Sequence, residues 1–271
     1  MDDVVDRLET TQRRFDNALF VGADGFTTRL TAAADVGRIV HVDPEPARLA
    51  GAPAPLRVAA EEDAWPFARR FHLIVSILTL HGANDLVGAL TQMRRSLVPD
   101  GFFVAALFGE ETLSALRAAL FAAESAAFGG ASPRVAPFAA VRDLGGAMQR
   151  AGFALPVVDL DTVRVRYDNP LRLFADLRAM GETSFLASRG RPLTRAIIAD
   201  AAARLAANPD GVRFDVIYLT GWAPAESQPQ PLRPGSGKVS LADALRVDVD
   251  GSVGDGDGPD GGGGGDGTGK T

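Results

Sequence analysis

The sequence predicts an α/β protein built on a mostly parallel sheet, with helices on both faces and an antiparallel hairpin at one edge. Two observations lead to this prediction. The run from Leu73 to Leu80 is apolar except for Ser76 and Thr79, is short for a helix and is rich in β-branched residues, as in a strand buried on both faces. Strand-length and helix-length segments also alternate along the chain, which is typical of α/β folds.

Two strands and a helix are expected before that buried run. Residues 18–22 (ALFVG) form a short strand, and Thr27 can cap a helix that continues to Ala34. Residues 38–42 form the second strand. Strand and helix therefore alternate from the beginning of the chain.

A helix and another strand follow the buried run. Asn84 or Asp85 can cap the helix, whose apolar residues recur at helical spacing, and Pro99 with Gly101 can end it. The turn VPDG then leads into a strand at 102–108, at a separation that fits a right-handed parallel crossover. Ligands of such sheets bind outside the carboxyl ends of the strands.

The second half of the chain adds the edge hairpin and further helices. Residues 157–167 and the segment FDVIYLTGWAP are expected to pair as antiparallel strands. Helical cap elements are expected at 129–138 and within 168–208. The other predicted helices lie at 111–128, 139–151, 170–180 and 193–207.

The chain is expected to form one main domain followed by a tail. A hydrophobic content of 46% is ample for a buried core, and we assign residues 1–223 to the domain. Residues 224–271 are rich in Pro, Gly, Ser and Asp, and they are predicted to be disordered.

Composition excludes several functional classes. The net charge is −6 and the basic residues are dispersed, so no nucleic-acid or anionic-membrane partner is expected. The absence of cysteine excludes disulfides, thiolate zinc sites, iron–sulfur clusters and cysteine nucleophiles. The first residues are acidic, and no apolar run approaches the roughly 18 residues of a membrane span. We therefore predict a cytoplasmic protein without an integral membrane segment.

The first candidate site residues follow the first two strands. Gly22 lies in the turn VGADGF, where backbone amides at the next helix can face an anionic group. Asp43 ends the second strand, a position from which a carboxylate accepts hydrogen bonds from ribose hydroxyls. The alternative for Asp43 is a turn-forming role before Pro44.

Further candidates are acidic or imidazole side chains. Glu61, Glu62 and Asp63 could place an acceptor near an adenine amino group, or they could form a solvated turn. His81 follows the central strand and is the candidate catalytic residue, as a contact to an acceptor substrate or as a base.

The same residue types also suggest a possible metal site. His41 and Asp43 with His81 or His72 could nominate a two-histidine, one-carboxylate iron site. Nothing in the sequence places the third ligand, so no metal is predicted.

The chain resembles the class I methyltransferases that bind S-adenosylmethionine, over roughly residues 15–165. The segments EEDAWPF, FHLIVSILTLHGAND and LVPDG carry this resemblance. A narrower likeness, to the mitochondrial complex I assembly-factor methyltransferase-like proteins and to the biotin-pathway methyltransferases, rests on LHGAND, AALFGEETLSALR, SPRVAPFAAVRDLG, LRAMGETS and SQPQPLRPGSGKVSL. The resemblance implies a Rossmann-like sheet of seven strands and S-adenosyl-L-methionine as cofactor. The cofactor-binding residues that it implies are Gly22, Ala23, Asp43, Pro44, Glu61, Glu62 and Ser76.

The chain departs from this family at the turn after strand one. The family pattern there is acidic-x-Gly-x-Gly-x-Gly, whereas this chain has Phe20, Gly22, Asp24 and Phe26. Asp24 would repel the carboxylate of the ligand, and Phe26 would crowd the backbone approach that glycine permits.

Three functions remain open. The first is methylation of an unidentified small-molecule or protein acceptor in a pocket roofed by 133–138 and 170–191, where Arg178, Arg189 and Arg191 could bind an acidic group. The second is assembly of a respiratory-chain subunit or its arginine hydroxylation, and the third is a scaffold that has lost its cofactor. A nicotinamide-dependent dehydrogenase would require Gly-x-Gly-x-x-Gly, which VGADGF does not supply.

Overall fold

A computed structural model of the chain describes residues 2–22, 24–51, 56–62, 64–184, 186–188 and 190–229. Contacts divide the chain into two units, 1–228 and 229–271. Residues 225–228 form a turn in the first unit, where the Gln228 side chain donates to Asp100 and to the Ala223 carbonyl. Almost all of the predicted tail lies outside the described residues, so its disorder stays a prediction.

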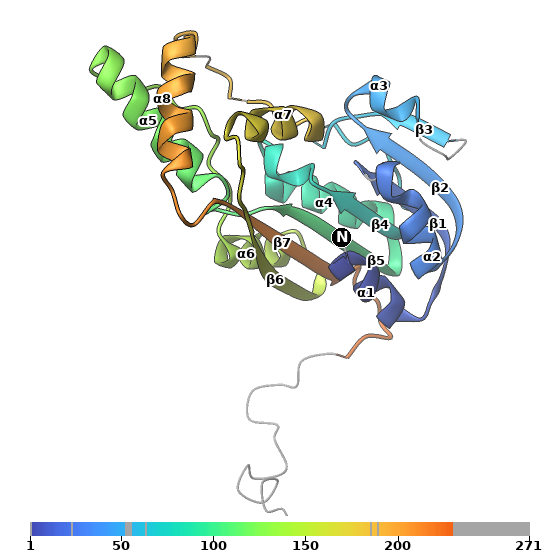
Figure 1. Cartoon of the computed structure of the whole chain (residues 1–271). Helices are drawn as coiled ribbons and strands as arrows, with labels where there is room; N and C mark the ends of the chain where they lie inside the picture. Colours follow the sequence, from blue (N-terminus) through green and yellow to red (C-terminus); the bar gives the residue numbers. More distant parts are fainter. Residues whose placement is uncertain are drawn as a thin grey trace, which may run out of the picture. The chain divides into compact units, whose positions relative to one another are not determined.

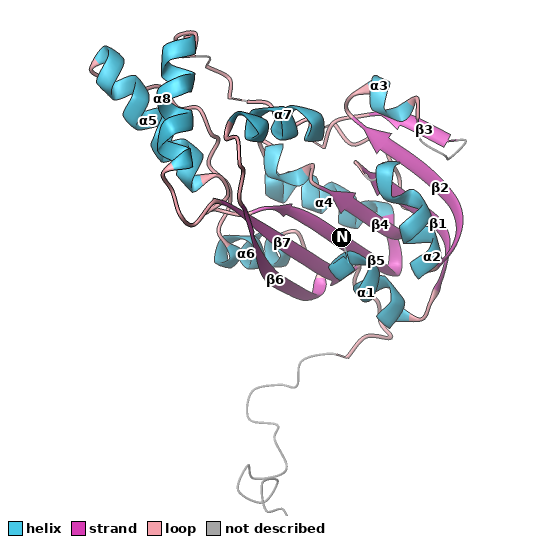
Figure 2. Cartoon of the chain, viewed as in Figure 1, coloured by secondary structure: helices cyan, strands magenta, loops and turns pink. Residues whose placement is uncertain are grey.

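The seven strands of the first unit form one mixed sheet, in the order β3-β2-β1-β4-β5-β7-β6 (Figures 1 and 2). The first five are parallel, and β7 pairs antiparallel with both β5 and β6, which confirms the predicted architecture and edge hairpin. The strands are β1 (Arg14–Val21), β2 (Asp35–Asp43), β3 (Leu56–Ala59), β4 (Phe71–Ile77), β5 (Leu97–Phe108), β6 (Ala154–Val165) and β7 (Val212–Trp222).

Helices cover both faces of the sheet (Figure 2). Apolar residues of α4 and α6 pack on one face, and those of α1 and α2 pack on the other. Central strands β4 and β5 are buried from both sides, which explains their nearly continuous apolar sequences. The helices of these layers are α1 (Asp2–Thr11), α2 (Thr27–Ala33), α4 (Leu86–Ser96) and α6 (Val141–Arg150), and a short α3 (Pro46–Leu49) follows β2.

A third apolar cluster lies beyond the end of β5. It joins α5 (Ser114–Phe128), α7 (Leu171–Met180) and α8 (Arg195–Ala206) to Phe108 and Phe214 of the sheet. Helices α5 and α8 lie side by side, and α7 lies between them and α3 in the view of Figure 1. We call these three helices the cap.

Several sequence-based predictions need correction. Strand β4 ends at Ile77 rather than Leu80, because Leu78 has a φ of 52° and the short 3-10 helix η2 (Leu80–Gly82) follows. Residues 129–138 contain no helix, and they cross the cap as a loop held by side-chain contacts. Helix α1 and strand β3 were not placed from the sequence, because α1 is polar and β3 is only 4 residues long.

Two predicted caps have different outcomes. Asp85 accepts a hydrogen bond from the Gly88 amide at 2.8 Å and caps α4 as expected. Thr27 is instead the first residue of α2, and its hydroxyl lies 3.1 Å from His41 Nε2. None of the helices in the described residues is long and apolar enough to cross a membrane.

Candidate functional site

The strand order reverses between β1 and β4, which is the switch point at which open α/β sheets bind ligands. Val21 at the end of β1 lies opposite Val42 on one side and Ser76 on the other. The chain leaves β1 at Gly22 and leaves β2 at Asp43, so both residues lie at the same edge of the sheet. We call this edge the donor crevice.

Gly22 is the residue that makes the turn after β1 possible. Its φ is 63°, and its amide donates to the Val42 carbonyl at 3.0 Å. A Cβ atom would lie 2.4 Å from Thr79 Cγ2 and 2.6 Å from the Ile77 carbonyl oxygen. Only glycine therefore fits between β1 and the turn after β4. The next predicted residue, Ala23, lies outside the described residues.

Ser76 acts on this turn through Thr79. Its side chain is fully buried, and its hydroxyl lies 2.9 Å from the Thr79 hydroxyl. This hydrogen bond holds Thr79 against Gly22. A direct contact between Ser76 and a cofactor stays a prediction. Thr79 carries no local sequence signal that would mark it as a site residue.

Asp43 is buried at the end of β2. One carboxylate oxygen, Oδ1, accepts from the Glu45 amide at 2.8 Å, and the other, Oδ2, lies 3.9 Å from Nη1 of the half-exposed Arg48. Pro44, which follows, is exposed. The turn-forming role considered for Asp43 is thus present, and its role in binding ribose stays a prediction.

The acidic turn after β3 adjoins Asp43, because Ala59 of β3 lies opposite Asp43 of β2. Glu61 is exposed, whereas Glu62 is half-buried and its Oε1 atom is buried without a hydrogen-bond partner among the described residues. A buried carboxylate oxygen without a partner is costly and suits a ligand that donates a hydrogen bond. Contacts of Glu61 and Glu62 with an adenine amino group stay predictions. Asp63 lies outside the described residues.

Phe26, which replaces a family glycine, does not fill the space between Asp43 and Glu61. It ends the short helix η1 (Asp24–Phe26) and packs in the cluster formed with α1 and α2. Trp65, which stands in the segment EEDAWPF where the resembled family has leucine, packs on the opposite face, and its indole donates to the Ser96 hydroxyl at 2.9 Å. Both aromatic side chains thus pack in the core.

His81 joins the end of β4 to the cap. Its side chain is only 4% exposed, and its Nε2 lies 3.0 Å from Oε2 of Glu182, just after α7. Its ring contacts Phe108 and Phe138, at centroid distances of 5.0 and 5.6 Å. The catalytic role of His81 stays a prediction. Glu182, which is 101 residues away, was not recognised because no local sequence pattern connects the two.

The histidines are not gathered into one site. His41 contacts Thr27, and His72 lies near the beginning of β4, where its Nδ1 accepts from the Asn17 amide at 3.4 Å. His72 and His81 therefore lie at opposite ends of β4. The described part of the chain contains no group of three side chains suited to hold a metal ion.

A cavity of about 640 Å³ opens inside the cap, beside His81. Its walls are apolar residues of α5 and α7 together with the loops 133–138 and 182–193, which overlap the predicted roof at 133–138 and 170–191. That it receives the acceptor stays a prediction. Glu182, Arg178 and Arg191 also line it, whereas Arg189 lies outside the described residues. We call it the acceptor cavity.

A buried ion pair holds the loop of the acceptor cavity in place. Glu124 of α5 accepts hydrogen bonds from the Arg134 guanidinium and, at 2.9 Å, from the Ser132 amide. The hydrogen bond from Arg134 holds the pKa of Glu124 below its usual value, against the opposing effect of burial. Arg134 also donates to the Arg191 carbonyl, which links the loop to the cavity's far wall.

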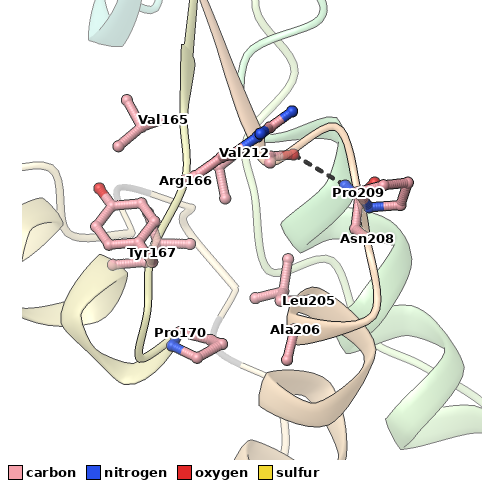
Figure 3. Close-up of a pocket in the computed structure, with 11 residues that line it drawn as sticks. Val165, Arg166, Tyr167, Pro170, Leu205, Ala206, Asn208, Pro209 and Val212 are labelled. Atoms are coloured by element: carbon pink, nitrogen blue, oxygen red, sulfur yellow. Dashed lines mark hydrogen bonds between the residues drawn. The ribbon is translucent and has the colours of Figure 1, made fainter.

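A second cavity of about 400 Å³ lies where β6, α7, α8 and β7 meet (Figure 3). Tyr167, Pro170 and Leu205 line it, and Asn208 closes the turn before β7 by donating to the Gly211 carbonyl at 2.9 Å. Burial raises the pKa of the Tyr167 phenol, as does its hydrogen bond to Asp176. The described residues that line this cavity include none of the predicted site residues, so it is separate from the donor crevice.

Known proteins are similar to this chain in sequence and in fold. A family model described as a methyltransferase domain matches residues 19–105. The chain is 36% identical over 258 residues to rat arginine-hydroxylase NDUFAF5, mitochondrial, which covers 90% of this chain and 75% of that protein. It is 34% identical over 238 residues to malonyl-[acyl-carrier protein] O-methyltransferase of Halorhodospira halophila, covering 82% and 79%. The chain belongs to the class I S-adenosylmethionine-dependent methyltransferase family.

Other relatives define the extent of this likeness. The chain is 40% identical to zebrafish NDUFAF5 over 197 residues, which cover 70% of this chain and 61% of that protein. Phosphoethanolamine N-methyltransferase 2 of Haemonchus contortus, solved with S-adenosylhomocysteine, has the same fold with a TM-score of 0.50 and 12% identity, covering 82% of this chain and 53% of that one. S-Adenosylmethionine, predicted from the sequence, is the cofactor of the family.

The predicted cytoplasmic location is contradicted by these relatives. The NDUFAF5 proteins of zebrafish, rat and human are described as mitochondrial. Composition and the apparent lack of a signal core were therefore insufficient to assign a compartment.

Proposed function

We propose that this chain is an S-adenosylmethionine-dependent methyltransferase that holds its methyl donor in the donor crevice and its acceptor in the acceptor cavity. The observation that carries the proposal is the convergence of Gly22, Asp43 and Glu62 at the ends of neighbouring strands. These residues supply a close backbone approach, a buried carboxylate and a carboxylate oxygen without a partner.

Each residue would have a distinct task. Asp43 would accept hydrogen bonds from ribose hydroxyls, Glu62 would accept one from the adenine amino group, and the turn at Gly22 would admit the rest of the ligand. When bound, S-adenosylmethionine supplies an electrophilic methyl group, so transfer requires little acid–base assistance. Rate would then come from in-line positioning and from water exclusion by Phe108 and Phe138, which enclose His81.

The acceptor cavity favours a substrate with an apolar body and an acidic group. Its leucines and phenylalanines offer an apolar lining, and Arg178 and Arg191 lie on its walls. No ion pair within 4.0 Å is found for either arginine among the described residues. An acidic group could therefore pair with them without first displacing another carboxylate.

Calorimetric titration with S-adenosylhomocysteine tests the proposal. We expect saturable binding of one ligand per chain, which is lost on Asp43→Ala. Retained binding by the variant would remove Asp43 from the site. If the native protein does not bind but a variant with glycine at positions 24 and 26 does, the native chain is a scaffold that has lost its cofactor.

A second candidate function rests on the NDUFAF5 relatives, which are described as arginine hydroxylases. It would make the acceptor an arginine of a protein partner, such as a respiratory-chain subunit. The partner would be isolated with the tagged chain and analysed by mass spectrometry. A mass increase of one oxygen atom would favour hydroxylation, and an increase of one CH₂ unit would favour methylation.

A further inference from the structure

The turn that follows α7 is a fixed structure rather than a loose connection. Gly181 has a φ of 83°, and its amide donates to the Arg178 carbonyl at 3.1 Å. The Glu182 amide donates to the Leu177 carbonyl at 2.8 Å. This pair of hydrogen bonds is a glycine-dependent helix end of the Schellman type, which sets the direction in which Glu182 leaves the helix.

One side of this turn is in contact with the residue that pairs with Asp43. The Arg48 guanidinium makes a long hydrogen bond of 3.5 Å to the Met180 carbonyl, and its Nη1 lies 3.9 Å from Asp43 Oδ2. A Cβ atom at Gly181 would lie only 1.5 Å from Arg48 Nη2. A side chain at 181 would therefore strain the backbone and displace the Arg48 guanidinium from its present position.

The other side of the turn is in contact with the end of β4. Glu182 Oε2 lies 3.0 Å from His81 Nε2, and both side chains are largely buried, at 13% and 4% exposed. Because the His81 ring is enclosed by Phe108 and Phe138, the hydrogen bond has a defined direction. Burial makes this contact stronger than a similar one on the surface.

The two contacts belong to the strands on either side of β1. Arg48 follows β2 and His81 follows β4, and the sheet order places β1 and its Gly22 turn between them. We propose that the Gly181–Glu182 turn is a lid over the donor crevice, with Arg48 and His81 as its two latches and Glu182 as a positioning residue. This inference rests on the proposed function, because the lid has a task only if a methyl donor occupies the crevice.

The lid connects the two halves of the site. Glu182 also lines the acceptor cavity, so the position of the closed turn determines the shape of that cavity beside His81. Asp43 interacts with Arg48, so a donor that engages Asp43 acts on the first latch directly. Under this proposal, a bound donor stabilises the closed lid and completes the wall that the acceptor meets.

Gly181→Ala tests the first latch, and Gly129→Ala is its matched control. Both glycines end a helix at positive φ, 83° and 71°, but a Cβ at Gly129 would meet no atom within 4 Å. Alanine therefore adds similar backbone strain at both positions, but only Gly181→Ala displaces the Arg48 guanidinium. We expect S-adenosylhomocysteine to dissociate at least about ten-fold faster from Gly181→Ala than from Gly129→Ala, as for the loss of a charged hydrogen bond.

Glu182→Ala tests the second latch, with Glu182→Gln as the conservative variant and the exposed Glu110→Ala as control. The readout is amide hydrogen–deuterium exchange over residues 178–184, with and without S-adenosylhomocysteine. We expect the ligand to slow this exchange in the native protein and in Glu110→Ala, to have little effect in Glu182→Ala, and to have a partial effect in Glu182→Gln.

The outcomes separate the lid from the proposed function. If calorimetry detects no ligand binding by the native protein, the proposed function fails and the lid fails with it. If the ligand binds but exchange over 178–184 is the same with and without it, or if Gly181→Ala releases it as slowly as Gly129→Ala, only the lid is overturned.

Discussion

The donor crevice and the acceptor cavity are built in different ways. The crevice is formed by residues that directly follow β1, β2, β3 and β4, and the hydrogen-bonded sheet fixes their positions. The acceptor cavity is formed by helices and loops from 108 to 193, which meet only through side-chain packing and buried polar contacts. The sheet thus determines the geometry of the donor crevice, whereas the geometry of the acceptor cavity depends on particular long-range residue pairs.

The two regions also differ in the balance of charge. Asp43 and Glu62 outnumber Arg48 at the crevice, while Arg178 and Arg191 outnumber Glu182 on the cavity wall. This separation suits a donor that offers hydroxyl and amino groups and an acceptor that carries an acid. Variants in either region should therefore affect one ligand more than the other.

The largest expected effect is on the cavity side, at Glu124. Glu124→Ala leaves the Arg134 guanidinium, 15% exposed, without its buried partner, and we expect a loss of about 3 kcal/mol in the free energy of unfolding. Denaturant unfolding with Glu110→Ala as control measures this loss. Affinity for S-adenosylhomocysteine should remain within about two-fold, since the sheet is unchanged. A large loss of affinity would show that the Glu124–Arg134 pair, and not only the lid, couples the acceptor cavity to the donor crevice.

The Glu124–Arg134 pair also makes the stability of the protein depend on pH. Because Arg134 lowers the pKa of Glu124 from its usual 4.5, the stabilisation is complete above that value and is lost as pH falls through the lowered pKa. The stability difference between the native protein and Glu124→Gln should therefore shrink in acid. A difference that grows in acid would show that the ionised carboxylate is not the stabilising form.

The next largest effect is in the crevice, at Gly22. In Gly22→Ala, the Cβ atom would overlap Thr79 and the Ile77 carbonyl at a left-handed φ, with an expected loss of about 2 kcal/mol of stability. Binding of S-adenosylhomocysteine should fall below detection. Gly25→Ala in the same turn meets open space and should remain within about 0.5 kcal/mol of the native protein. Equal effects of the two changes would show that the predicted close approach at Gly22 is wrong.

A smaller effect separates the two glutamates of the acidic turn. Glu62→Ala should lower the affinity for S-adenosylhomocysteine about ten-fold, because it removes a charged hydrogen-bond acceptor. Glu61→Ala, at an exposed position, should have little effect on this affinity. The ligand S-inosylhomocysteine, which lacks the amino group, provides the cross-check. The native protein and Glu61→Ala should prefer the adenosyl ligand, and Glu62→Ala should not. A preference retained by Glu62→Ala would place the amino group elsewhere.

These differences explain how much could be predicted from the sequence. Gly22 and Asp43 were found because they lie at strand ends, and the position of a strand end follows from local apolar patterns. The acidic turn was found from its own charges and from the family resemblance, since β3 was not placed from the sequence. Glu182 and Arg48 could not be found in this way, because their partners are fixed only when α7 docks near α3. Residues 129–138 (GGASPRVAPF) look like a loop by their own sequence, although we grouped them with the helical cap elements; what holds the loop is the contact of Arg134 with Glu124, which no local pattern reveals.

The smallest effect concerns Asp24, where the family has glycine. The sequence places a carboxylate in the turn that should face the carboxylate end of the ligand, and two like charges near a surface weaken binding by a modest amount. Asp24→Asn should therefore raise the affinity for S-adenosylhomocysteine about three-fold, and high salt should reduce this gain because it screens the repulsion. Asp24→Gly removes the same charge and also restores backbone freedom. If only the glycine variant gains affinity, the conformation of the turn, and not the charge of Asp24, limits the affinity for S-adenosylhomocysteine.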